Sequence, residues 1–510
     1  MTGTARGAQG KGGRARGADF LQLSPAAAPA RGLTSWLADA VRAAVIDGRL
    51  QAGAPLPATR VLADDLGISR GVIVEAYQRL ADEGLVSAGP GAGTRVLGLR
   101  AAGPREEGPR EEGTREPGAG GDLGSARLPR RWRERAEIDL SPGVPDLSGF
   151  PRAAWLRAER SVLRRASMAD LGYGDPRGSP WLRTELTSWL ARTRGLRTGP
   201  GDIIIVTGVA QALAVLAQAL ARDPATREIA VEDPGSRGSR DELAYWGLRT
   251  VPVGVDDHGL MVGELARTDL RAVLLTPAHQ FPTGVVLAPG RRRDLLDWAT
   301  RTDALIIEDD YDAEYRYDRA PVPALQASAP GQVAYAGSTS KTLAPGMRLG
   351  WLIPPAQMRA SLTEAKHASD LGSPALPQLV LAHLIASGEL ERHIRAVRKR
   401  QRGRRDALLR ALGEHLPKAR VQGVAAGLHL LITFPGLALD DTSLAERMLA
   451  AGLLVHPLSW HRQRPGPPGF VLGYAAHTPD QLRHAVARIA DVLASAGTRI
   501  SCAGGRPGAP

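Results

Sequence analysis

The stretch AYAGSTSKTLAPGMRLGW, residues 334–351, decides the fold that we expect for most of this chain. A short apolar run leads into a loop that carries Ser338, Ser340 and Lys341, and Arg348 follows seven residues after the lysine. An amine can form a Schiff base with an aldehyde, whereas hydroxyls and a guanidinium donate charge-assisted hydrogen bonds to phosphate oxygens. The spacing therefore predicts a site for an aldehyde cofactor that carries a phosphate. Taken alone, such a segment is more often a surface loop.

Lysine is scarce in this chain, which makes Lys341 informative. Of the 65 Lys and Arg residues, five are lysines and 60 are arginines. Arginine therefore supplies most of the positive charge, and it cannot replace an amine in a covalent reaction with an aldehyde.

Two upstream stretches offer groups that complement the amine. LIIEDDYDAEY, residues 305–315, has the pattern of an apolar strand that ends in acids; we expect Asp309 to pair with a protonated pyridine nitrogen and Tyr311 to reach a ring oxygen. IIIVTGVAQAL, residues 203–213, predicts a strand, a glycine turn and a helix start. Free backbone N–H groups at such a helix start bind phosphate, here at Gly208, Val209 and Ala210. Singly, an acidic strand end is usually a solvated turn or a cap, and one glycine turn is uninformative.

Residues 138–395 alternate strand and helix patterns. Apolar, β-rich runs predict strands at 203–207, 228–231, 272–276, 304–308 and 333–336, and helical patterns at 209–221 and 291–302 lie between them. This alternation predicts an α/β domain with a mostly parallel sheet covered on both faces. Residues 396–495 have fewer strand signals and predict a smaller α+β domain.

Residues 32–98 predict a winged helix-turn-helix. Helices are expected at 33–46, from 58 to a C-cap at Gly67, and at 70–83 after an N-cap at Ser69, and strands at 84–86 and 94–96 flank a glycine-rich turn. The first residues of a recognition helix face base edges, so we expect DNA contacts from Ser69, Arg70 and Gly71, with phosphate contacts from Arg60 and Arg95. Residues 31–100 carry eight basic and seven acidic side chains. DNA binding must therefore depend on local placement, and the alternative is a small helical module that binds protein.

The remaining segments predict tails and a linker. Residues 1–31 and 496–510 are expected to be flexible, and 99–137 to be a linker, because GPREEGPREEGTREPGAGG (103–121) cannot bury a core.

The single cysteine, Cys502, excludes a disulfide framework and a multi-cysteine zinc site, and we expect no metal. No run of about 18 apolar residues and no signal-peptide pattern occurs. We expect a cytoplasmic protein without a membrane partner.

The stretch VLADDLGISRGVIVEAYQRLADEGLVSAGPGAGTRV, residues 61–96, resembles the winged helix of the GntR superfamily. The preceding DGRLQAGAPLPATR, residues 47–60, is similar to the connection between the first two helices of that family. The resemblance implies DNA contacts from Arg60, Ser69 and Arg70, and from Gly91, Gly93 and Thr94 in the wing.

Residues 138–495 resemble pyridoxal 5′-phosphate (PLP) enzymes of fold type I, the aminotransferase class. The resemblance extends to YGDPRGSPWLRTELTSWLARTRGL (173–196), VEDPG (231–235), TPAHQFPTG (276–284) and LGYA (472–475). A GntR-type winged helix, a linker and such a domain together resemble the MocR family of regulators. The resemblance implies a homodimer with two DNA readers, with PLP bonded to Lys341, Asp309 at the pyridine nitrogen, Tyr311 at the ring oxygen, Arg348 and Ser338 at the phosphate, and His279 and Gln280 beside the ring.

Three positions depart from the pattern of these families. Ser236 stands where an aromatic residue commonly stacks on the pyridine ring, a contact worth about 0.5–1.5 kcal/mol beyond burial. Val209 and Ala210 replace polar residues at the phosphate. Val471 stands where aminotransferases place an arginine that binds the substrate carboxylate. The absence of this arginine counts against amino-acid turnover.

A basic segment, residues 391–420, holds eleven Lys and Arg against three acidic residues. It predicts either a long solvated helix that joins the two parts of the larger module or a second surface for the DNA backbone.

The sequence favours a PLP-responsive transcriptional regulator, controlling vitamin B6 synthesis first and amino-acid or amine metabolism second. The alternatives are an active aminotransferase with an attached DNA-binding domain, and a PLP-type fold that serves only for dimerisation.

Overall fold

The computed structural model describes residues 21, 23–25, 28–29, 32–89, 93–97, 132, 135–312, 314–317, 322–434 and 440–503. The chain forms two compact units, Met1–Ala119 and Gly120–Pro510. Most of the predicted N-terminal tail and linker lies outside the described residues. None of the helices within the described ranges is long and apolar enough to cross a membrane.

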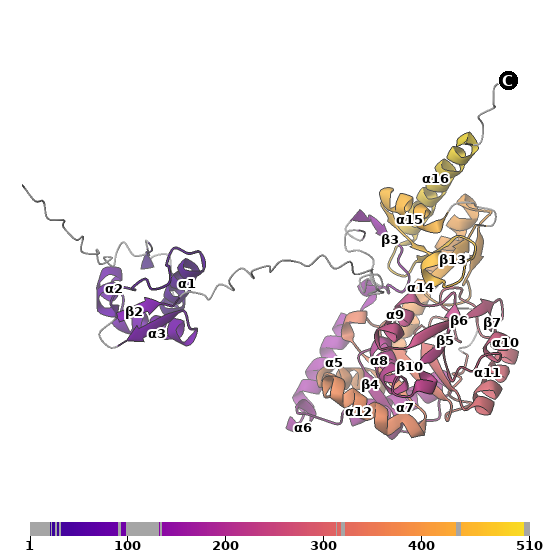
Figure 1. The fold of residues 1–510 in the computed structure, drawn as a ribbon, viewed down its shortest axis with the longest axis horizontal. Coiled ribbons are helices and arrows are strands. Elements are labelled where there is room, and N and C mark those ends of the chain that lie inside the picture. Colours follow the sequence, from indigo (N-terminus) through magenta and orange to yellow (C-terminus); the bar gives the residue numbers. More distant parts are fainter. Residues whose placement is uncertain are drawn as a thin grey trace, which may run out of the picture. The chain divides into compact units, whose positions relative to one another are not determined.

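The first unit is a winged helix-turn-helix, as predicted (Figure 1). It contains α1 (Leu33–Ile46), α2 (Thr59–Leu66), α3 (Arg70–Asp82) and an antiparallel pair, β1 (Val86–Gly89) and β2 (Gly93–Val96). Gly67 ends α2 in the left-handed conformation, with φ of 64°. The first wing strand starts two residues later than predicted, because Gly84, with φ of 72°, turns the chain after α3.

The second unit is built on an eight-stranded sheet of order β4-β11-β10-β9-β8-β5-β6-β7. Strands β10, β9, β8, β5 and β6 run parallel, whereas β11 runs antiparallel to β10 and β4. The strands are β4 (Ile204–Val206), β5 (Glu228–Asp233), β6 (Arg249–Asp256), β7 (Gly259–Leu260), β8 (Ala272–Leu275), β9 (Leu305–Asp310), β10 (Val333–Ser338) and β11 (Gly350–Ile353).

Helices cover both faces of this sheet, which confirms the α/β prediction. Alternate strand residues point to opposite faces, and Ile204 and Val206 pack in a different cluster from Ile203 and Ile205. One face carries α8 (Val209–Leu220), α9 (Arg237–Tyr245) and α12 (Arg359–Asp370). The other carries α5 (Arg152–Arg165), α7 (Pro180–Arg194), α11 (Pro289–Thr302) and α13 (Ala375–Ala386).

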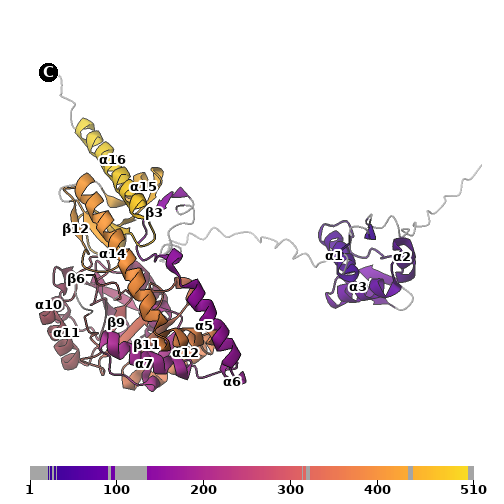
Figure 2. The same cartoon turned by 180° about the vertical axis from the view of Figure 1, so that it is seen from behind.

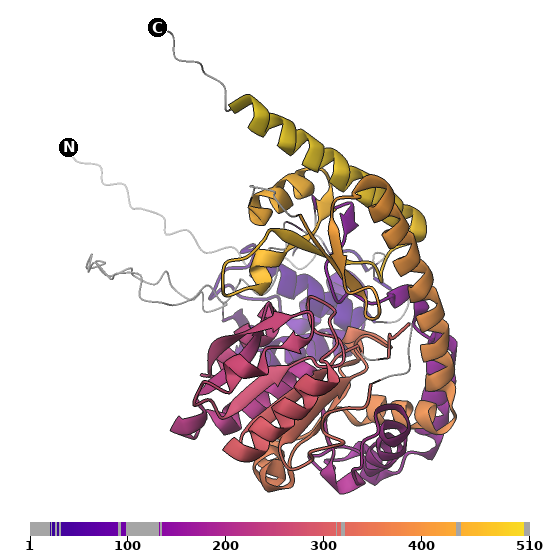
Figure 3. The same ribbon diagram turned by 90° about the vertical axis from the view of Figure 1, so that its right-hand side faces the viewer.

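A smaller antiparallel sheet, of order β12-β13-β16-β15, follows in sequence. It contains β12 (Arg420–Gln422), β13 (His429–Thr433), β15 (His456–Pro457) and β16 (Gly469–Gly473) and packs with α14 (Glu389–His415), α15 (Asp441–Ala450) and α16 (Pro479–Ala503). Figures 2 and 3 show α14 running from the helices of the large sheet to the side of α16.

Three predicted boundaries differ from these elements. The boundary at 395 falls inside α14, whose buried face is continuous from Leu390 to Leu412. Strand β3 (Ile138–Asp139), at the start of the range assigned to the large domain, pairs with β14 (Leu453–Leu454) in the small domain. Helix α16 reaches Ala503 inside the predicted tail, because no proline follows Pro479 before the Gly-Gly pair at 504–505.

Candidate cofactor site and DNA-binding surface

A cavity of about 340 Å³ opens in the second unit where the parallel strands end. Strands β9 and β10 end there, and α8 begins there after β4, which is the edge at which α/β folds bind ligands. Nine of the predicted cofactor residues line it, namely Gly208, Val209, Ala210, Asp309, Tyr311, Ser338, Ser340, Lys341 and Arg348.

The amine of Lys341 lies in the cavity and is held by backbone. Its Nζ donates a hydrogen bond to the carbonyl oxygen of Gly143 at 2.6 Å. Burial lowers the pKa of Lys341, and the carboxylates of Asp312 and Asp309 oppose this shift in part. A lowered pKa increases the fraction of neutral amine, the form that attacks an aldehyde.

The carboxyl of Asp309, on β9, faces the same cavity with an unused acceptor. Its side-chain oxygen Oδ1 is buried and has no hydrogen-bond partner among the residues that the structure describes. Burial, with the charges of Asp310 and Asp312, raises the pKa of Asp309 to about 8. Because a buried acceptor without a partner is costly, this atom fits a ligand that presents an N–H group, as a protonated pyridine does.

The other end of the cavity suits a phosphate. Gly208 has φ of 107°, and a Cβ at this position would lie 3.5 Å from Nη1 of Arg348. The guanidinium of Arg348 has no hydrogen bond or ion pair to any described residue. With the first N–H groups of α8 and the hydroxyl of Ser338 it forms a polar cradle for an anion. The residues present therefore fit PLP.

His279 and Gln280 do not line this cavity. Nδ1 of His279 lies 3.0 Å from the Tyr311 hydroxyl and 2.9 Å from Oδ2 of Asp312. This imidazole therefore contacts the tyrosine that lines the cavity without lining the cavity itself. The Gln280 amide instead donates to the carbonyl oxygens of Pro234 and Phe281.

Several lining residues were not predicted as site residues, including Pro142, Gly143, Thr276, Phe281 and Ser239. Pro142 and Gly143 lie about 200 residues before Lys341, and the only local signal is a Pro-Gly turn pattern. Ser236 also lines the cavity, and its hydroxyl accepts a hydrogen bond from the N–H of Ser239 at the start of α9.

Val471 lies on β16 between Leu431 of β13 and His456 of β15. It is fully buried and packs with Leu431 and Leu458, against which Phe281 is also packed. Phe281 lines the cavity, and Val471 puts no guanidinium at the position where the family resemblance predicts an arginine for a substrate carboxylate.

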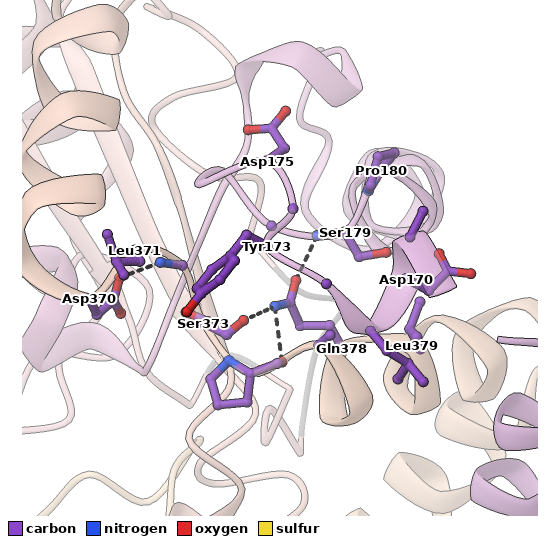
Figure 4. Close-up of a pocket in the computed structure, with 18 residues that line it drawn as sticks. Asp170, Tyr173, Asp175, Ser179, Pro180, Asp370, Leu371, Ser373, Gln378 and Leu379 are labelled. Carbon is purple, nitrogen blue, oxygen red and sulfur yellow. Dashed lines mark hydrogen bonds between the residues drawn. The ribbon is translucent and has the colours of Figure 1, made fainter. Parts of the chain in front are cut away.

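A second cavity, of about 320 Å³, lies between the start of α7 and the α12–α13 connection (Figure 4). The Gln378 side chain joins its walls, since its carbonyl accepts from the N–H of Ser179 and its amide donates to the Ser373 carbonyl. Apolar side chains beside it are strongly exposed, namely Met168, Leu171, Tyr173 and Leu371.

The predicted DNA contacts of the first unit gather around α2, α3 and the wing. Nε of Arg70 lies 3.4 Å from the Thr59 hydroxyl, which joins the starts of α3 and α2. The chain before Thr59 pairs with the wing, since Leu56 N–H donates to the Thr94 carbonyl and Arg95 donates to the Gly53 carbonyl. Most of the predicted DNA-contact residues in these elements are exposed, and Thr94 is half-buried. The exposed residues are Arg60, Ser69, Arg70, Gly71, Gly93 and Arg95.

Two predictions in this unit differ from the structure or fall beyond it. Ser69 occupies the N-cap position of α3, but its side chain makes no capping hydrogen bond. Gly91 lies outside the described residues.

Most of the arginines in the basic segment (residues 391–420) bind groups within the second unit. Arg400 and Arg404 form ion pairs with Asp146, Arg405 pairs with Asp406, and Arg398 donates to the Glu314 carbonyl. These contacts favour the structural alternative, and the DNA-backbone alternative stays a prediction.

Comparison with known families supports the two-unit organisation. Residues 33–96 match the bacterial regulatory proteins of the gntR family, and residues 135–489 match aminotransferase class I and II. Membership of the second fold family implies dependence on PLP.

Similar proteins share the whole arrangement. The HTH-type pyridoxine biosynthesis transcriptional regulator PdxR of Corynebacterium glutamicum is 34% identical, covering 90% of this chain and 95% of its own length. The probable rhizopine catabolism regulatory protein MocR of Rhizobium meliloti is 30% identical over 88% of this chain and 91% of its own.

Among solved structures, a Pyrococcus horikoshii kynurenine aminotransferase superposes with a TM-score of 0.67 and 26% identity, covering 72% of this chain and 95% of its own. Matching domains in this order, and relatives similar along nearly their whole length, establish the family. The chain belongs to the MocR-type transcriptional regulators, in which a GntR-family DNA-binding domain precedes an aminotransferase class I and II domain.

Proposed function

We propose that this regulator binds PLP at Lys341 and changes its affinity for DNA in response. The observation that carries the proposal is the cavity that brings together the amine of Lys341, the guanidinium of Arg348 and Oδ1 of Asp309, which has no partner among the described residues. PLP supplies an aldehyde that attaches covalently to an amine. Lys341 would supply that amine, Asp309 would hold the pyridine nitrogen, and Arg348 with the start of α8 would hold the phosphate.

The neighbours of these residues orient them. The Tyr311 hydroxyl, hydrogen-bonded to His279, is the group that we assign to the ring oxygen. Oδ2 of Asp312 lies 2.9 Å from Nδ1 of the same histidine and holds the imidazole next to the tyrosine. The likeness to PdxR, a regulator of pyridoxine biosynthesis by its name, supports vitamin B6 genes as the first targets to test, with amino-acid or amine genes next.

We propose that the chain acts as a homodimer. Leu171, Tyr173 and Leu371 line the cavity of Figure 4 with exposed side chains, and Met168, three residues before Leu171, is also exposed. An exposed apolar patch of this kind is typical of a protein interface. Two winged helices would then read a repeated half-site.

Amino-acid turnover is not part of the proposal, because Val471 supplies no guanidinium at the position where the family resemblance predicts an arginine. Mixing the PLP-loaded protein with a panel of amino acids tests this point. Conversion of PLP to pyridoxamine 5′-phosphate with release of a keto acid would favour the enzyme alternative.

The proposal is tested by measuring DNA affinity at upstream fragments with and without PLP. Wild type should develop a visible absorbance band with PLP, yield a borohydride-stable pyridoxyl adduct on Lys341 and change its affinity for DNA. Lys341→Ala should give neither band nor adduct and should not respond to PLP. Lys399→Ala, at an exposed lysine on α14, should form the adduct and respond to PLP as wild type does. A colourless wild-type protein without the adduct would contradict the proposal.

A further inference from the structure

Residues 139–149, here called the strap, cross the cofactor cavity beside Lys341. Pro142 and Gly143 of the strap line the cavity, and the Gly143 carbonyl accepts the hydrogen bond of the Lys341 amine at 2.6 Å. In the sequence the strap directly follows residues 99–137, through which the chain comes from the DNA-binding unit.

Gly143 can make this contact because it is glycine. Its φ of 79° lies in the left-handed region, and a Cβ at this position would lie 3.1 Å from Nζ of Lys341. Any other residue would therefore be strained and would crowd the amine.

Hydrogen bonds and ion pairs hold the strap on both sides of Gly143. Before Gly143, the Leu140 N–H donates to the Leu454 carbonyl, and the Leu140 carbonyl accepts from the N–H of Gly473. After Gly143, the buried carboxylate of Asp146 forms ion pairs with Arg400 at 3.2 Å and with Arg404 at 3.1 Å on α14. The strap thus links the small sheet, the amine and α14.

Attachment of an aldehyde to Lys341 must change the hydrogen bond between its amine and the Gly143 carbonyl. When the neutral amine condenses with an aldehyde, a C=N bond replaces the C=O bond, and the carbonyl oxygen leaves as water with both amine hydrogens. Nζ then loses the freely rotating N–H groups that the amine presents to Gly143. The Gly143 carbonyl, now without its donor, favours a different position of the strap.

We propose that the strap reports cofactor attachment to the rest of the chain, and that the Gly143–Lys341 hydrogen bond is a latch that attachment opens. This inference rests on the proposed function. A ligand shifts a conformational equilibrium only through contacts that differ between the two states. The latch is such a contact, because it exists only while the amine is free.

The first test removes the amine from the cofactor-free protein. Lys341→Met should open the latch, so its DNA affinity without PLP should match that of PLP-loaded wild type, a change of about fivefold or more. Lys399→Met, the matched control, should keep the full wild-type change in DNA affinity when PLP is added. If Lys341→Met binds DNA like cofactor-free wild type, the latch is wrong.

The second test frees one end of the strap and leaves the cavity residues intact. Asp146→Asn removes the ion pairs with Arg400 and Arg404, and Asp257→Asn removes the exposed pair with Arg420 as a matched control. Asp146→Asn should still form the pyridoxyl adduct, but PLP should change its DNA affinity less than about twofold, below the usual range of coupling. A full PLP response in this variant would overturn the inference.

Hydrogen exchange on wild type needs no variant. PLP should increase exchange at the amides of residues 139–149, including the Ser141 N–H that now donates to Asp139. Unchanged exchange in a protein that carries the Lys341 adduct would reject the strap and leave the proposed function standing. Absence of the adduct would instead reject the proposed function.

Discussion

Ser236 stabilises the helix that follows it, at a position where the family resemblance predicts an aromatic ring. Its hydroxyl accepts from the Ser239 N–H at 3.2 Å and also lies 2.9 Å from the Ser239 hydroxyl. Such N-cap contacts typically contribute about 1 kcal/mol. A serine here therefore stabilises α9, but it cannot stack on the cofactor ring as an aromatic residue would.

We predict that Ser236→Tyr tightens PLP binding and destabilises the protein. Stacking worth about 0.5–1.5 kcal/mol should lower the Kd by roughly twofold to tenfold, while loss of the cap should lower the free energy of unfolding by about 1 kcal/mol. Absorbance titration with PLP and thermal unfolding measure the two effects. Ser236→Ala is the control, because it loses the cap without gaining a ring. Equal Kd values for the two variants would show that no stacking occurs.

The elements that the sequence predicted are those with local signals. Lys341 and Gly208 each follow a strand, and Asp309 lies near the end of one. The apolar runs of these strands are visible in the sequence, so the strand order alone brings the three residues to one edge. Gly143 was missed because its contact with Lys341 joins positions 198 residues apart and depends on the pairing of β3 with β14. The sequence placed a domain boundary at 395, inside α14, because charged residues on the exposed face of this helix mask its continuous buried face.

Helix α3 should read DNA with its first turn only. Arg70 lies exposed at the start of α3, whereas Arg79, nine residues later, donates to Glu75 and to Ser35 of α1. We predict that Arg70→Ala weakens binding to a specific site by about 1–3 kcal/mol and relaxes sequence preference, as loss of a base contact does. Arg79→Ala should leave DNA affinity within about twofold of wild type, because it removes no DNA contact. Fluorescence anisotropy on specific and scrambled duplexes separates the two variants, and equal losses would contradict this placement of the recognition surface.

At the scale of the molecule, each unit has a core of its own. The apolar cluster of the winged helix contains only residues from 21 to 96, and those of the second unit begin at Ile138. Two units that fold around separate cores communicate through the chain between them or through a dimer. Regulation is therefore expected to act on the spacing of two DNA readers more than on the fold of either one.

A spacing experiment tests this view directly. In an operator with two half-sites, insertion of about 5 base pairs turns one half-site to the opposite face of the duplex, whereas about 10 base pairs restore the face. We predict that the shorter insertion weakens binding more than the longer one, as measured by anisotropy with wild type. Leu371→Asp puts a charge into the exposed apolar patch, at a position whose φ of 57° suits aspartate better than leucine. This variant should sediment as a monomer and lose the dependence on spacing, whereas a variant that remains dimeric would show that the patch is not the interface.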